Sequence, residues 1–191
     1  MAAPGGSGPI GPYPPRVEDS DEARDEYDRL RRRVLWSLPY GLYVVGSRAE
    51  VGGEVRRNLM TLNWATQVSF DPKLVGIGVE KPALTHELVS AGGVFSLCTV
   101  AREDRAIVRK FTKPVGVDED TRTMNGFDYV EAVTGAPILA AAPAYLDCEV
   151  RQAVDVGNHT FFIGEVLDAA FQGDEDTEVL RMEDTRMNYG G

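Results

Sequence analysis

The stretch from residue 58 to residue 80 constrains the fold more than any other part of the sequence. Its side chains alternate in size and polarity, which is typical of a strand with two different faces. One face carries Met60, Leu62, Trp64, Thr66 and Val68, and the other carries Leu59, Thr61, Asn63, Ala65, Gln67 and Ser69. A turn at Asp71-Pro72 follows, and residues 74–80 predict a second strand. The sequence therefore predicts two adjoining strands and a β-rich fold.

The second of these strands has an unusual face. Val75, Ile77 and Val79 point one way, whereas Gly76 and Gly78 lie on the opposite side. Glycines on one face of a strand often mark the close approach of a flat group or of another backbone. Glycines that relieve curvature in a closed barrel are the alternative, and the sequence leaves both interpretations open.

A helix start follows this strand directly. Residues 85–89 predict a short helix with Thr85 at the N-cap. A simple cap is one interpretation. In the other, the free backbone N–H groups, the Thr85 hydroxyl and Lys81 together bind a phosphate.

The rest of the chain predicts strands joined by short turns, with few helices. Residues 1–15 contain five prolines and four glycines, which favours disorder. We predict helices at 20–37 and 102–111, strands at 40–47, 93–100, 145–153 and 159–169, a turn at 155–158, and a surface loop at 112–126. About six strands in this order favour an antiparallel barrel over a βαβ sheet.

Charge and apolar runs exclude several functional classes. The chain has 30 acidic and 20 basic residues, a net charge of −10, which disfavours binding to nucleic acid. Half of that charge, −5, lies in residues 168–191. The uncharged run 132–146 is only 15 residues long and contains two prolines, so it is too short to span a membrane. With no signal peptide recognised, we expect a cytoplasmic protein.

No local motif for metal binding or nucleophilic catalysis is present. Cys98 and Cys148 form no CxxC pair, and His86 and His159 are the only histidines, so we predict no metal site and two buried thiols. The glycine fingerprint of dinucleotide-binding folds is also missing. An enzyme of this composition would have to carry its chemistry on a cofactor.

Two blocks of sequence resemble a known family. The first contains the run 58–72 (NLMTLNWATQVSFDP), the strand 74–81 (LVGIGVEK), Thr85-His86 and Gly93-Val-Phe-Ser96. The second contains TGAP at 134–137, CEV at 148–150 and GNHTFFIGEV at 157–166. In order and spacing these blocks are similar to the flavin reductase-like family, which has an FMN-binding split barrel. The resemblance covers roughly residues 35–170.

The resemblance implies a fold, an activity and a set of binding residues. The implied fold is mainly β, a six-stranded antiparallel split barrel of Greek-key type with a few flanking helices. The implied protein is a homodimeric NAD(P)H:flavin reductase that binds FMN, or alternatively FAD, and passes electrons to a partner monooxygenase or another acceptor. By position, the implied flavin-binding residues are Thr61, Asn63, Trp64, Ala65, Thr66, Lys81, Thr85 and Ser96, with His159 on the nicotinamide side. Of these, Lys81 and Thr85 would hold the phosphate.

Residue 158 departs from the family pattern. It is Asn where the family usually has Asp, so a charge next to His159 is lost, although Asn still donates and accepts hydrogen bonds. His159 could face the nicotinamide or be a satisfied structural histidine, and Trp64 could contact flavin or pack in the core. A flavin-binding electron carrier without nicotinamide activity and a deazaflavin-dependent reductase are the alternative functions. The choice between NADH and NADPH stays open.

The expected domain organisation has three parts. Residues 1–19 form a disordered tail. Residues 20–170 form one split-barrel domain, preceded by the N-terminal helix. Residues 171–191 form an acidic C-terminal extension.

Overall fold

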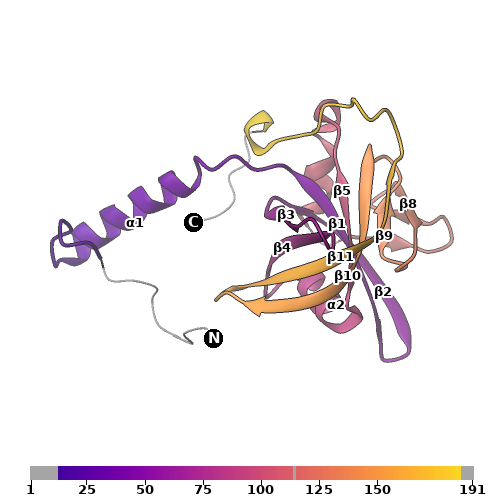
Figure 1. The fold of residues 1–191 in the computed structure, drawn as a ribbon, viewed down its shortest axis with the longest axis horizontal. Coiled ribbons are helices and arrows are strands. Elements are labelled where there is room, and N and C mark those ends of the chain that lie inside the picture. The colour runs from indigo at the N-terminus through magenta and orange to yellow at the C-terminus, as the bar shows by residue number, and fades with distance from the viewer. Residues whose placement is uncertain (1–12, 114, 186–191) are drawn as a thin grey trace. The chain divides into compact units, whose positions relative to one another are not determined.

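The computed structural model describes residues 13–113 and 115–185 of the chain (Figure 1). It separates into two compact units at Pro39: an N-terminal unit, which contains helix α1, and a second unit from Tyr40 to Arg186, which carries all the strands described. Most of the predicted disordered tail, residues 1–12, lies outside the described residues. None of the described helices is long and apolar enough to cross a membrane.

Helix α1 (Asp21–Leu35) confirms the helix predicted at 20–37. Ser20 caps it, because its hydroxyl accepts a hydrogen bond from the Ala23 N–H at 3.3 Å. Acidic residues lie in the first turn and arginines in the last, which complements the helix dipole. No residue of the helix is buried, so local capping and charge account for it rather than packing.

The second unit is built on one large antiparallel sheet and one small sheet. The large sheet contains β1 (Tyr43–Val51), β2 (Glu54–Leu62), β3 (Ala65–Ser69), β4 (Leu74–Glu80), β5 (Val94–Thr99), β10 (Ala144–Asp155) and β11 (His159–Phe171), in the order β2-β1-β5-β10-β11-β4-β3. The small sheet contains β6 (Val117–Asp118), β7 (Thr123–Met124), β8 (Phe127–Glu131) and β9 (Pro137–Leu139). The helical elements are α2 (Leu84–Gly92) and the short 3₁₀ segments η1 (Arg102–Asp104), η2 (Ile107–Phe111) and η3 (Met182–Asp184). The protein is therefore mainly β with a few helices, as predicted.

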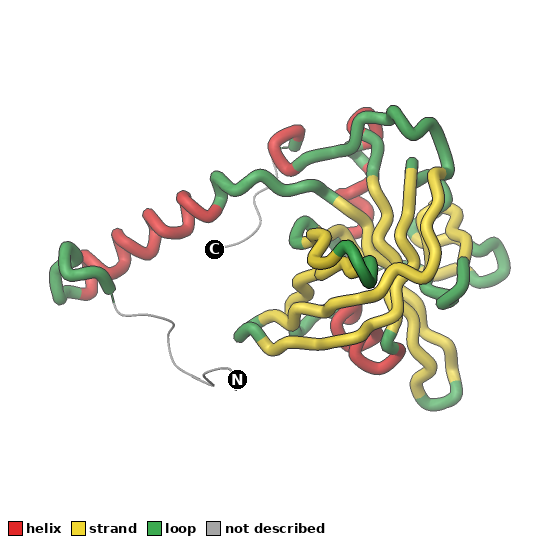
Figure 2. Tube along the Cα trace, viewed as in Figure 1, coloured by secondary structure: helices red, strands yellow, loops and turns green. Residues whose placement is uncertain are grey.

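The predicted count of six barrel strands is not confirmed, because the large sheet has seven strands and its hydrogen bonds do not close it. The single strand predicted over 58–69 is in fact two strands, β2 and β3, which form the two edges of the sheet. Only Asn63 and Trp64 separate these edges in the sequence. The sheet must therefore curl so that these two edges come together at this corner. Its strands are drawn in yellow in Figure 2.

The break at this corner also changes which side chains face the core. Leu62, at the end of β2, belongs to the core cluster, and Ala65, at the start of β3, packs against the same cluster. Two residues three positions apart would lie on opposite faces of one continuous strand. The alternation predicted across 58–69 is thus correct within β2 and shifted by one residue in β3.

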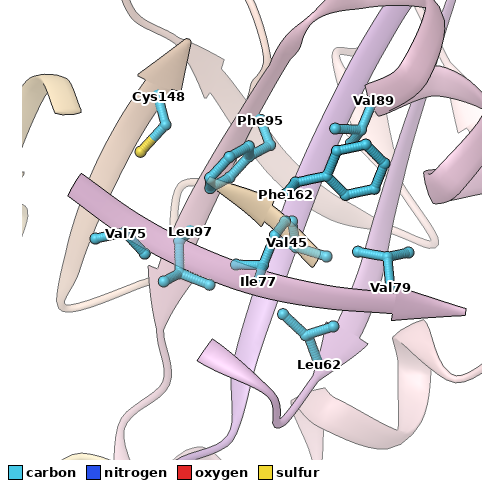
Figure 3. Packing of buried hydrophobic residues seen from close by; sticks show 10 residues of the cluster. All are labelled: Val45, Leu62, Val75, Ile77, Val79, Val89, Phe95, Leu97, Cys148 and Phe162. Carbon is cyan, nitrogen blue, oxygen red and sulfur yellow. The ribbon is translucent and has the colours of Figure 1, made fainter. Parts of the chain in front are cut away.

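The curled sheet encloses one hydrophobic core (Figure 3). Its ten buried members come from six strands and from α2: Val45, Leu62, Val75, Ile77, Val79, Val89, Phe95, Leu97, Cys148 and Phe162. Each large apolar side chain buried in this way contributes about 1.5–3 kcal/mol to folding. Cys98 is also buried, which confirms the prediction of two buried free thiols.

The opposite face of β1 and β5 is covered by β9. Gly46 makes this contact possible, because a Cβ there would overlap the carbonyl oxygen of Pro137. Ser96 lies beside it, fully buried, and its hydroxyl donates to the same Pro137 oxygen at 2.6 Å. Strand β9 therefore packs directly on β1 and β5, at a position that has no room for a side chain larger than that of glycine.

The C-terminal segment is joined to the sheet unit. Leu180 is fully buried, its N–H donates to the Val100 carbonyl at 2.8 Å, and its own carbonyl accepts from the Leu42 N–H at 3.0 Å. Part of the predicted acidic extension, residues 171–191, thus contacts the ends of β1 and β5. Residues 186–191 lie outside the described residues.

Two local predictions gave the wrong type of secondary structure. The helix predicted at 102–111 is two separate 3₁₀ segments, and the loop predicted at 112–126 contains the short strands β6 and β7. The turn predicted at 155–158 is confirmed, because it joins β10 to β11 as an antiparallel hairpin.

Candidate functional site

Aromatic rings lie over the two glycines of β4. A Cβ on Gly78 would lie 3.1 Å from Cε3 of Trp64, and a Cβ on Gly76 would overlap the ring of Phe161. The glycines therefore do admit flat groups, and these groups are rings of the same chain. Trp64 is partly buried, and its ring also contacts the ring of His159. The two ring centroids are 4.5 Å apart, and the interplanar angle is 43°. We call Trp64, Gly78, Phe161 and His159 the Trp64 face.

Two buried side-chain nitrogen atoms, one in this face and one in the residue before Trp64, have no hydrogen-bond partner among residues 13–113 and 115–185. One is Nε2 of His159, a residue only 7% exposed, and the other is Nδ2 of Asn63, a residue 3% exposed. The other ring nitrogen of His159, Nδ1, is 2.9 Å from Oδ1 of Asn158. A buried polar group left unpaired costs about 1–3 kcal/mol. Such atoms next to a flat aromatic surface fit a site that is completed by a ligand with hydrogen-bonding groups.

The predicted phosphate end lies where β4 leads into α2. Lys81 precedes α2, and its Nζ forms an exposed ion pair with Oδ2 of Asp155 at 2.8 Å. The hydrogen bond from Lys81 holds the pKa of the Asp155 carboxyl below its usual value. The predicted N-cap at Thr85 is wrong: Ala83 is the N-cap, and it makes no side-chain cap bond. Thr85 lies in the first turn instead, fully buried, where its hydroxyl accepts from Nδ2 of Asn58 at 2.9 Å.

Two residues near this end were missed by the sequence analysis. Asn58 anchors Thr85, and the only signal for it was a polar residue at the start of the alternating run. Nε2 of His86, in α2, lies 2.8 Å from Oγ1 of Thr160 in β11. Burial and, after it, the charge of Lys81 lower the pKa of His86, which favours the neutral ring. These contacts fix the start of α2 against β2 and β11.

The structure does not bring the hydroxyls of Thr61 and Ser96 to the Trp64 face. The Thr61 hydroxyl donates to the Val108 carbonyl at 2.5 Å, and the Ser96 hydroxyl donates to the Pro137 carbonyl. Both side chains therefore serve contacts within the fold. Backbone contacts from Ser96 and its neighbours, which the resemblance implied, stay a prediction.

Ala65 and Thr66 line a cavity of about 260 Å³. Its other lining residues are Tyr43, Gln67, Val75, Leu97, Thr99, Ala144, Tyr145 and Leu146. Burial raises the pKa of Tyr43, and the Tyr145 hydroxyl donates to Oδ2 of Asp168 at 2.8 Å. This mostly apolar hollow opens between the first residues of β1 and β10 and strand β3, whereas α2 packs near the opposite ends of β1 and β2.

Seven of the nine predicted site residues fall into three groups. Trp64 and His159 form part of the Trp64 face, and Asn63 precedes Trp64 in the sequence. Lys81 precedes α2 and Thr85 lies in its first turn, whereas Ala65 and Thr66 line the cavity. The hydroxyls of Thr61 and Ser96 bond to backbone carbonyls instead. No group of three or more metal-binding side chains occurs in the described part of the chain.

Comparison with known proteins gives a consistent result. The family model described as "Flavin reductase like domain" matches residues 35–191. An NADH-dependent FAD reductase of Streptomyces globisporus is 36% identical over 163 residues, 81% of this chain and 83% of that protein. The NADH-dependent flavin reductase StyB of Pseudomonas fluorescens is 32% identical over 76% of this chain and 80% of its own length. Among solved structures, the NADH:FAD oxidoreductase SgcE6 of Streptomyces globisporus C-1027, in complex with NAD and FAD fragments, matches with a TM-score of 0.68 and 30% identity over 87% of this chain and 94% of that one.

Proposed function

The chain belongs to the flavin reductase-like family, and from this premise we propose that it transfers a hydride from a nicotinamide to a bound flavin. The observation that carries the proposal is the buried Nε2 of His159, which has no hydrogen-bond partner among the described residues and belongs to a ring whose centroid is 4.5 Å from that of Trp64. A flavin and a nicotinamide are both flat and carry hydrogen-bonding groups at their edges, so they suit such a surface. The name of one relative favours FAD as the flavin, and the names of two favour NADH as the donor.

The chain's own residues would bind and orient the two cofactors. When bound, flavin supplies the hydride acceptor and the store for two electrons. Asn63, whose amide donor has no partner in the described part of the chain, would donate to an acceptor at the flavin edge, and Trp64 would restrict the orientation of the flavin ring. His159 would face the nicotinamide. None of these residues has to transfer a proton, because positioning alone accounts for much of the rate of such a reaction.

Lys81 and the first turn of α2 would hold the flavin phosphate. The helix start offers backbone N–H groups and the positive end of the helix dipole. Lys81 adds a full charge at the same place. Because the Lys81 ammonium group already forms an ion pair with Asp155, a phosphate would have to displace the Asp155 carboxylate.

We also propose that the curled sheet is the predicted split barrel and that two copies of the chain form a homodimer. Exposed aromatic side chains support the dimer. Phe171, 60% exposed, pairs with the cavity residue Ala144, and Phe70, in the turn before β4, is 83% exposed. A monooxygenase or another acceptor would receive the electrons, in the cytoplasm.

The purified full-length chain provides the test. We expect a flavin absorbance, either as purified or after addition of FMN or FAD, and oxidation of NADH, followed at 340 nm, faster than free flavin alone supports. Failure to bind either flavin at micromolar concentration would refute the proposal. Flavin binding without nicotinamide oxidation would instead indicate an electron carrier.

A further inference from the structure

We propose that Asn158 is a positioning residue that fixes the neutral tautomer of His159, so that Nε2 faces the ligand as a hydrogen-bond acceptor. The identity of the ligand, a nicotinamide, rests on the proposed function. The tautomer itself rests only on the geometry of this chain.

The turn that carries Asn158 is held at several points. Gly157 has a φ of +97°, and its N–H donates to Oδ1 of Asp155 at 3.0 Å. The carbonyl of Asn158 accepts from the Lys81 N–H at 3.0 Å, which ties the turn to the end of β4. The backbone on both sides of the Asn158 side chain is therefore fixed.

The contact between the two side chains determines where the ring proton lies. Oδ1 of Asn158, 2.9 Å from Nδ1 of His159, is an amide oxygen and can only accept. With the amide in this orientation, Nδ1 is the donor and carries the proton. A neutral imidazole has one N–H, so Nε2 is left with its lone pair.

That lone pair is kept away from water. His159 is more than nine-tenths buried, the Trp64 ring covers it, and no described residue donates to Nε2. A ligand that brings an N–H or O–H donor satisfies this atom, whereas a carboxylate would place two electron-rich groups together. The carboxamide of nicotinamide has such a donor, and the carboxylate of nicotinic acid does not. His159 would therefore select the amide form of the dinucleotide.

The tautomer can be observed directly. We suggest two-bond ¹H–¹⁵N correlation NMR of the ¹⁵N-labelled full-length protein at pH 8. The chain has only two histidines, so His159→Gln assigns both rings, and His86 serves as the internal reference. The proposal predicts a proton on Nδ1 of His159 in the native chain and in Asn158→Asp, which keeps an acceptor oxygen. It predicts loss of this preference in Asn158→Ala. A proton on Nε2 in the native chain, or an unchanged spectrum in Asn158→Ala, would overturn it.

A second measurement tests the selection. We expect kcat/KM for reduced nicotinic acid adenine dinucleotide to be at least about tenfold below that for NADH in the native chain, because a buried acceptor would lose its donor. In Asn158→Ala, the ratio of kcat/KM for NADH to kcat/KM for reduced nicotinic acid adenine dinucleotide should fall toward one. Equal use of both dinucleotides by the native chain would contradict the acceptor role. A sample that reduces no flavin would refute the proposed function, and its NMR spectrum would still decide the tautomer.

Discussion

Replacing Leu180 with alanine tests whether the acidic C-terminal segment is peripheral or part of the fold. The Leu180 side chain is fully buried, and its backbone bonds to both Val100 and Leu42. Leucine to alanine at buried positions costs about 2–5 kcal/mol, depending on how far the site can collapse. Because the flanking residues Val179 and Arg181 are exposed, the segment can move inward to fill part of the space, and we expect a loss of about 2–3 kcal/mol. For a chain of this size that corresponds to a fall in Tm of roughly 4–12 °C.

Urea and thermal unfolding of the full-length chain provide the assay, with Val179→Ala as the matched control. Val179 is adjacent, apolar and 47% exposed, so its truncation should change the free energy of unfolding by no more than about 0.5 kcal/mol. If Leu180→Ala is as mild as Val179→Ala, the burial argument fails, and the expected boundary at residue 171 gains support.

Three further outcomes can be measured. Asp155→Asn frees Lys81 for an anion and should strengthen FMN binding about two- to fivefold without affecting riboflavin, which lacks the phosphate; an equal change for both flavins would contradict the role of Lys81. Burial raises the pKa of Cys98 to about 11 and that of Cys148 to about 12, so both thiols are neutral at pH 8. Neither should react with iodoacetamide until urea unfolds the chain, and mass spectrometry of the native protein would detect a modification that refutes this. Gly46→Ala should destabilise the protein by about 2 kcal/mol or more in urea unfolding, since the new Cβ meets a backbone oxygen; unchanged stability would show that β9 can move away.

The sequence predicted the strands more reliably than their connections. Alternating side chains reveal a strand because the pattern depends only on nearest neighbours, and the hairpin at 155–158 contains a glycine. The break between β2 and β3 gives no such signal. Neither glycine nor proline occurs at Asn63-Trp64, and the chain changes direction there because the two edges of a curled sheet meet. That is a property of the whole sheet, so local propensity could not indicate it.

The candidate site was predictable in part for the same reason. Trp64 and His159 were both named from the sequence, and their rings do lie in contact; the cofactor-binding role of either residue stays a prediction. The hydroxyls of Thr61 and Ser96 are bound by backbone oxygens 47 and 41 positions away in the sequence. A resemblance identifies the position of a residue, but it does not show which distant carbonyl has already engaged its side chain.

The hairpin turn between β10 and β11 links the two ends of the proposed site. At one end, Asp155 holds the ammonium group of Lys81, where a flavin phosphate would bind. At the other end, Asn158 contacts Nδ1 of His159, on the side proposed for the nicotinamide. The same Asn158 also binds the Lys81 backbone N–H through its carbonyl. Because both contacts depend on one fixed turn, a substitution that loosens it, for example at Gly157 with its positive φ, should weaken flavin and nicotinamide binding together, whereas Asp155→Asn should affect the phosphate end alone.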